Sequence, residues 1–184
     1  MHSRQQVTAM TTSNIAVEFF EEVVKPTVDE YLARPEDIRR GRLAAIVLNH
    51  MVDYWSVDTA SGDTRKEREA ALEDARAALR ADTPIPNHPG YSAADIIRDL
   101  ADASKHAKLD RKSPPPQLTH AEQVKRHYIG AMGTSPMGTV PGGMLKPVDV
   151  RVTLDDGKSF ILSYVIRKVT DAWRNKLGIP GTQA

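Results

Sequence analysis

The sequence predicts an α+β domain: a mostly helical bundle with a β-hairpin near the C-terminus and a terminal helix packed on the hairpin. Apolar residues recur at helical spacing over most of the first 109 residues, which is the pattern of amphipathic helices. Apolar and polar residues then alternate over residues 148–154, and the Asp155-Asp156-Gly157 turn that follows favours a hairpin. A chain of 184 residues is long enough for one domain with its own core.

Two helices are expected in the first third of the chain. The first begins near Asn14, and Pro26 should kink or split it because proline has no backbone N–H to donate. The second spans residues 35–57. Its middle, residues 43–55, is apolar almost all round, so we expect a central and buried helix.

The next two helices carry their own start signals. Thr64 and Glu67 form a capping-box pattern ahead of a charged surface helix at residues 65–81. Ser92 is a residue type that caps helices, and it precedes a helix at residues 93–109.

The rest of the chain is less regular. We expect a short helix at residues 119–127, a long loop at 130–147, and a last helix at 164–177 that Gly178 ends. The predicted organisation is therefore a flexible tail at 1–12 and a single domain at 13–184, in which 13–109 form the bundle, 110–147 an irregular Pro/Gly-rich connection, and 148–177 the hairpin plus helix.

Composition excludes several function classes. The net charge of +1 lacks the basic excess of proteins that hold duplex nucleic acid, so a nucleic-acid partner is not expected. The absence of cysteine excludes disulfides, thiolate zinc sites and a cysteine nucleophile, and it fits a reducing compartment. No apolar run approaches the ~18 residues that span a bilayer, and the first ten residues lack the apolar core of a signal peptide. We therefore expect a cytoplasmic protein with no membrane partner.

Known catalytic motifs are absent. The glycines at 133–138 resemble a phosphate-binding loop, but Thr139 stands where that loop requires lysine. Neither a Gly-x-Ser-x-Gly elbow nor a His-Glu-x-x-His zinc motif occurs. No cofactor is therefore predicted from motifs.

The most informative residues are polar ones on helices that should be buried. His50 and Asp53 share one face of the second helix, and Asp102 and His106 share one face of the fourth. If these helices pack together, the four side chains converge and form a candidate site for a divalent metal, as between helices of a bundle. The competing interpretation is a hydrogen-bonded network that fixes packing, in which Lys105 pairs with one of the carboxylates. An acid–base role for either histidine is a further alternative.

Residues 105–126 form the only locally basic region. Its candidate phosphate or nucleic-acid ligands are Lys105, Lys108, Arg111 and Lys112. The competing interpretation is a helix C-terminus whose cations face the negative end of the helix dipole, followed by a solvated loop.

Two segments carry a resemblance. Residues 48–55 (LNHMVDYW) and 99–111 (DLADASKHAKLDR) resemble a group of uncharacterised bacterial and phage-associated proteins, in which such helices pair and a small hairpin and a Trp-bearing helix follow (here Trp173). The helical part is also faintly similar to nucleotide-acting domains of the HEPN type, whose Arg-to-His ribonuclease spacing is missing here. The resemblance implies a bacterial source and transfers no catalytic residue.

The function predicted from the sequence is a non-enzymatic interaction or regulatory domain. Its partner is another protein or a second copy of the chain, because a lone hairpin needs support from helices or from another subunit. The alternatives are a metal-dependent hydrolase or nuclease, and a weak nucleic-acid binder that uses residues 105–126.

Overall fold

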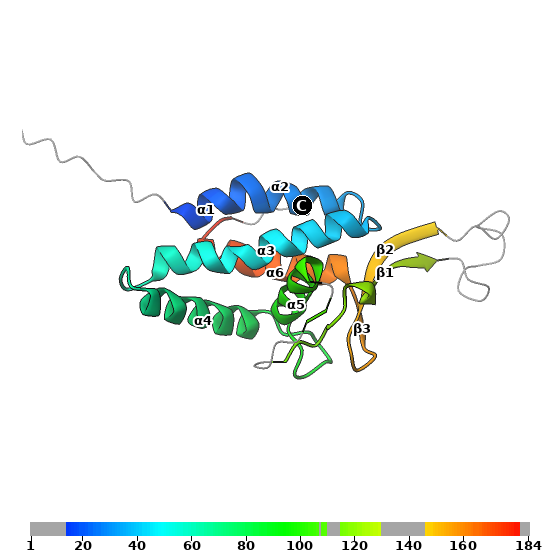
Figure 1. Ribbon diagram of the computed structural model, residues 1–184. Helices are drawn as coiled ribbons and strands as arrows, with labels where there is room; N and C mark the ends of the chain where they lie inside the picture. Colours follow the sequence, from blue (N-terminus) through cyan, green and yellow to red (C-terminus); the bar gives the residue numbers. More distant parts are fainter. Residues whose placement is uncertain (1–13, 107, 110–114, 130–145, 181–184) are drawn as a thin grey trace, which may run out of the picture.

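The computed structural model describes residues 14–106, 108–109, 115–129 and 146–180. It confirms the α+β class: long helices form a bundle, and a small antiparallel sheet lies at one end of it (Figure 1). The predicted tail at 1–12 and most of the predicted loop at 130–147 lie outside the described residues.

The first helical rod contains the interruption that Pro26 predicts. It consists of α1 (Ile15–Phe19), a π-helical turn η1 (Phe20–Val24) and α2 (Lys25–Leu32). The backbone N–H of Lys25 donates to the carbonyl of Phe20, five residues back, immediately before the proline. One wider turn thus accommodates the backbone N–H that Pro26 lacks, and the helical rod continues beyond it.

Helix α3 (Ile38–Thr59) is the central helix, but it begins three residues later than predicted. Its cap is Asp37, whose side chain accepts a hydrogen bond from the Arg40 backbone N–H at 3.2 Å. That hydrogen bond lowers the pKa of Asp37. A carboxylate that accepts a backbone donor is a stronger start signal than the proline at position 35.

Helix α4 (Arg65–Asp82) has the predicted capping box between Thr64 and Glu67. Helix α5 (Ala93–Lys105) starts at Ser92 as expected, but it ends four residues before the predicted boundary. His106 has extended backbone angles, φ −123° and ψ 130°, and so lies outside the helix. Beyond it, the Leu109 N–H donates to the Thr119 carbonyl at 2.8 Å, which draws this segment away from the helix axis.

The sheet has three strands in the order β1-β2-β3, all antiparallel: β1 (Val124–Ile129), β2 (Lys146–Thr153) and β3 (Ser159–Ile161). The β2–β3 pair is the predicted hairpin, and Gly157 supplies its turn with φ +84°. Strand β1 corrects two predictions. In place of the helix predicted at 119–127 there is a short 3₁₀ turn, η2 (Ala121–Gln123), followed by the first residues of β1, and the connection at 110–147 is therefore not irregular throughout.

The last helix, α6 (Leu162–Leu177), ends at Gly178 with φ +66°, as its sequence predicts. It completes one core, whose largest fully buried members come from helices and from the segment before η2: Trp173, Tyr31, Phe20, Leu48, Met51, Ile96, Leu100 and Leu118. None of the described helices is both long enough and apolar enough to cross a membrane.

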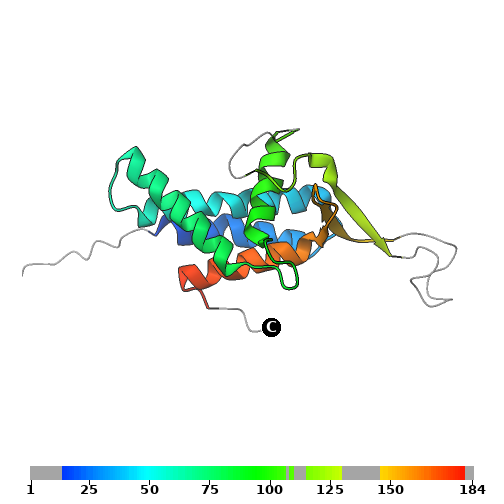
Figure 2. The ribbon, with the colours of Figure 1, turned by 90° about the horizontal axis from the view of Figure 1, so that it is seen from below.

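Helix α3 corrects the prediction of a helix buried all round. Its inner face, with Leu48 and Met51, is buried. Leu43, Tyr54 and Val57, which belong to the opposite face, are 42%, 37% and 53% exposed. Helix α5 crosses α3 at a steep angle and covers only part of its length (Figure 2).

Candidate functional site

Helices α3 and α5 pack against each other, as the predicted site requires. One contact between their polar side chains lies at the predicted site: the Lys105 Nζ is 3.0 Å from the Nε2 of His50. An ammonium next to an imidazole nitrogen makes a hydrogen bond in which the lysine donates. The contact thus occupies one of the two ring nitrogens of His50 through which a metal could bind.

The predicted metal shell is not assembled. Over the described part of the chain, no three or more His, Asp or Glu side chains are placed to hold one ion. Asp53 and His106 are both exposed, and His106 has left the helix whose face it was expected to share with Asp102. The helix pairing was therefore predicted correctly, whereas the four-residue convergence around His50 was not.

The basic segment is only partly described. Lys105 is engaged with His50, and Lys108 is exposed beside His120, with which its backbone forms an isolated β-bridge. Arg111 and Lys112 lie outside the described residues. Phosphate binding by this segment stays a prediction.

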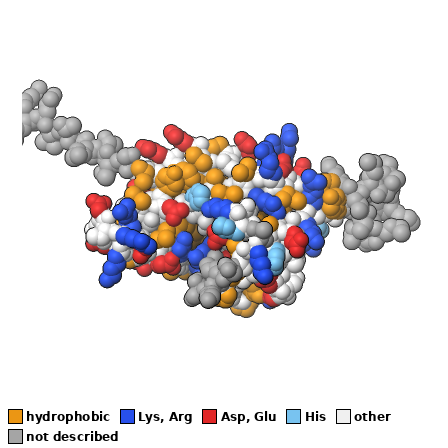
Figure 3. Space-filling model, in the orientation of Figure 1, with side chains coloured by type: hydrophobic (Ala, Val, Ile, Leu, Met, Phe, Trp, Pro, Cys, Tyr) orange, Lys and Arg blue, Asp and Glu red, His pale blue; other side chains and the backbone are white. Residues whose placement is uncertain are grey.

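The outer face of α3 carries four apolar side chains and one histidine, most of them within the stretch 43–55 that was predicted to be buried. Leu43, Ile46, His50, Tyr54 and Val57 follow one another at steps of three and four, so they line one side of the helix. We call these five residues the α3 stripe. Hydrophobic side chains are visible over α3 and the neighbouring rod in the space-filling view (Figure 3).

The rod beside α3 widens this surface. The ring of Phe19 stacks on the ring of Tyr54, with centroids 3.8 Å apart and planes 6° from parallel. Val23 in the π-helical turn is 37% exposed. The stripe therefore has a rigid aromatic border on its α1 side.

Charge is distributed unevenly along the same face. Near the start of α3 lie Arg34, Arg39 and Arg40, whereas Asp53 and Asp58 lie toward its end. Glu21 and Glu22 on the adjoining rod are exposed as well. Glu36 and Asp37 also lie near the start of α3, and Asp37 pairs with Arg40 at 3.8 Å, so this end keeps a small excess of positive charge whereas the other end is acidic.

The sequence did not predict a partly buried polar network around Asp149. Asp149 accepts hydrogen bonds from the Tyr31 hydroxyl at 3.2 Å, the Ser163 hydroxyl at 2.5 Å and the Val150 N–H at 2.7 Å. Burial, followed by the charge of Asp149, raises the pKa of Tyr31. The network joins α2, β2 and α6. Asp149 occupies a polar position of the alternating stretch 148–154, which is typical of solvent-facing strand residues, and no local signal relates it to residues 118 and 14 positions away.

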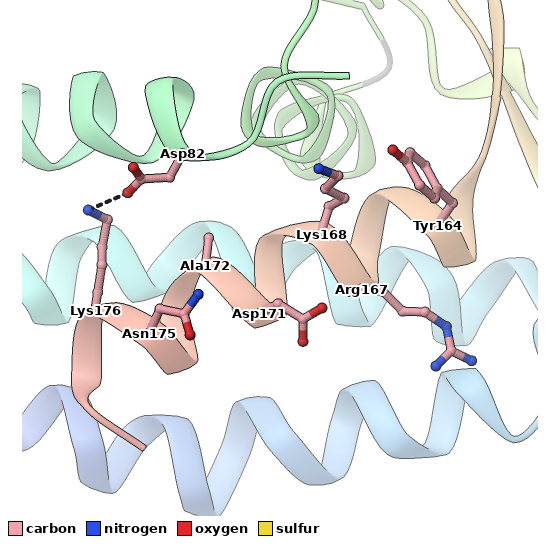
Figure 4. A pocket seen from close by; sticks show the side chains of 8 residues that line it. All are labelled: Asp82, Tyr164, Arg167, Lys168, Asp171, Ala172, Asn175 and Lys176. Carbon is pink, nitrogen blue, oxygen red and sulfur yellow. Dashed lines mark ion pairs between the residues drawn. The ribbon is translucent and has the colours of Figure 1, made fainter. Parts of the chain in front are cut away.

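A groove of about 750 Å³ runs along α6 (Figure 4). Its lining includes Tyr164, Arg167 and Lys168, and Lys176 spans it to pair with Asp82 at 2.7 Å. The charged groups of Arg167 and Lys168 point to different sides of the helix, so they do not converge on one ligand.

Comparisons with known proteins identify no relative of this chain. No family model matches the chain, and neither a curated protein nor a solved structure matches it. The resemblance of residues 48–55 and 99–111 therefore stays a prediction.

Proposed function

We propose that this protein is a non-enzymatic interaction domain that docks a protein partner on the α3 stripe. One observation carries the proposal. Among the residues that the structure describes, six large apolar side chains are exposed, and four of them, Val23, Leu43, Tyr54 and Val57, lie on this face. Exposed apolar side chains that are scattered singly need no explanation, but a contiguous group marks an interaction site.

The rigidity of this face also supports docking. The stripe lies on a helix whose inner face is anchored by Leu48 and Met51, both fully buried. Tyr54 is further fixed by its stack on Phe19. Rigid aromatic and aliphatic anchors lose little conformational entropy when a partner binds, and this is the character of residues that dominate binding energy.

The alternatives receive less support. The predicted metal-dependent hydrolase would use His50 as a ligand, whereas its Nε2 accepts from Lys105 and no three acidic or histidine side chains of the described residues are grouped to hold an ion. A nucleic-acid binder needs converging cations, and the charge of Lys105 is directed at His50. A cytoplasmic location is part of the proposal and rests on the absence of cysteine.

The experiment is site-specific photo-crosslinking in the cells from which the chain comes. Tyr54 is replaced by p-benzoylphenylalanine in one variant, and Tyr164 on α6 in a matched control. The two tyrosines are 37% and 40% exposed, so their accessibility is nearly the same and the face on which they lie is what differs. The expected result is a discrete protein adduct at position 54, of whatever composition, and none at position 164.

Two results would contradict the proposal. The first is no adduct at position 54. The second is an equal pattern of adducts at both positions, which would indicate random collisions with exposed rings.

A further inference from the structure

We infer that the partner on the α3 stripe is a second copy of this chain, docked with the two α3 helices antiparallel. This inference rests on the proposed function, because it identifies the partner of the same surface. It commits to a two-fold symmetric dimer in which each copy presents the stripe to the other. Such an interface must be complementary to itself.

The distribution of charge on the face meets that requirement. Arg39 near the start of α3 and Asp53 near its end are both exposed, and no salt bridge within the described part of the chain uses either of them. Besides the Arg40 backbone N–H, Arg39 lies close enough to the Asp37 carboxylate to contribute to lowering its pKa. Antiparallel packing places the basic end of one copy against the acidic end of the other. Parallel packing would set Arg39 against Arg39 and Asp53 against Asp53, which is repulsive.

The spacing of the outer residues fits such a seam. Arg39, Leu43, Ile46, His50, Asp53 and Val57 succeed one another at alternating steps of four and three, the repeat by which two helices pack side by side. A two-fold axis midway between Ile46 and His50 places Ile46 of each copy opposite His50 of the other copy. Arg39 then lies opposite Val57 and about 6 Å along the axis from Asp53, within reach of its long side chain.

Size and net charge suit a weak dimer. The 22 residues of α3 form a helix roughly 33 Å long, and Phe19 and Val23 widen its outer face. A single helix seam lies at the low end of stable interfaces, so the expected dissociation constant is on the order of 1–100 µM. A net charge of +1 gives little repulsion between copies.

The test is sedimentation equilibrium of the purified full chain with charge-reversal variants. Arg39→Glu and Asp53→Lys should each weaken the dimer about tenfold, because each places like charges at both ends of the seam. The double variant should return to within about threefold of the wild type, since both pairs are restored with opposite polarity. Arg167→Glu, an equal charge change on exposed α6, should leave the constant unchanged. Circular dichroism checks that each variant is folded.

The outcomes are separable. A wild-type chain that stays monomeric at 500 µM overturns the dimer, as do single reversals without effect. If the single variants weaken the dimer and the double variant does not regain the wild-type affinity, the antiparallel arrangement is overturned. If the chain is monomeric while position 54 crosslinks to a different protein, the dimer fails and the interaction function stands. If neither dimer nor adduct forms, both fail.

Discussion

Two polar clusters join distant parts of this molecule, and they differ in how much of the fold depends on them. The His50–Lys105 contact links α3 and α5 at the surface through one hydrogen bond. The Asp149 network links α2, β2 and α6 through three hydrogen bonds, and its Tyr31 is completely buried. Water can replace a lost partner in the first cluster but not around Tyr31 in the second. The His50–Lys105 contact therefore adds little to the packing of α3 on α5, whereas the Asp149 network helps to determine how α2, β2 and α6 pack together.

The largest expected effect is that of Asp149→Ala. The substitution removes the acceptor of all three hydrogen bonds and leaves the buried Tyr31 hydroxyl without a partner. We expect a loss of about 3 kcal/mol in the free energy of unfolding, measured by urea denaturation at pH 7. The matched control is Asp171→Ala, an exposed carboxylate on α6, with a loss below about 0.5 kcal/mol. Equal losses in the two variants would show that the network is no more important than a surface contact.

The next effect is that of Tyr31→Phe, which keeps the buried ring and removes only the hydroxyl. Asp149 retains two donors, so the expected loss at pH 7 is about 1 kcal/mol.

Alkaline pH sharpens this prediction. The folded-state pKa of Tyr31 is raised above the usual value of about 10, so only the unfolded chain ionises this group above that pH. The stabilisation from a raised pKa is complete below pH 10 and is lost as the pH rises. The wild type should therefore lose about 1.4 kcal/mol per pH unit relative to the phenylalanine variant between pH 10 and 11.5. If the free energies of unfolding of the two proteins change with pH in parallel, Tyr31 ionises equally in the folded and the unfolded state, which contradicts the prediction.

Local signals predicted most of the helical framework. The Thr64–Glu67 capping box, the Ser92 cap and the left-handed Gly178 each act within a few residues, so the sequence alone contains them. The interruption at Pro26 is equally local, since it follows from one missing donor.

Features that depend on distant partners could not be predicted in the same way. Strand β1 pairs with β2 across 16 intervening residues, and Val124 lies opposite Val152. The early end of α5 accompanies the bond from Leu109 to Thr119, which no helical pattern reveals. For the candidate site, the packing of α3 on α5 followed from their apolar faces, but which polar atoms meet depended on the exact end of α5.

The smallest expected effect is that of His50→Ala. His50 is half-buried and its one described partner, Lys105, is exposed, so the lysine regains water when the ring is removed. We expect a loss below about 0.5 kcal/mol at protein concentrations that keep the chain monomeric. A double-mutant cycle with Lys105→Ala should give a coupling free energy below about 0.5 kcal/mol. A coupling above about 1.5 kcal/mol would place this contact in the same class as the Asp149 network, and the pairing of α3 with α5 would then depend on polar recognition as well as on apolar burial.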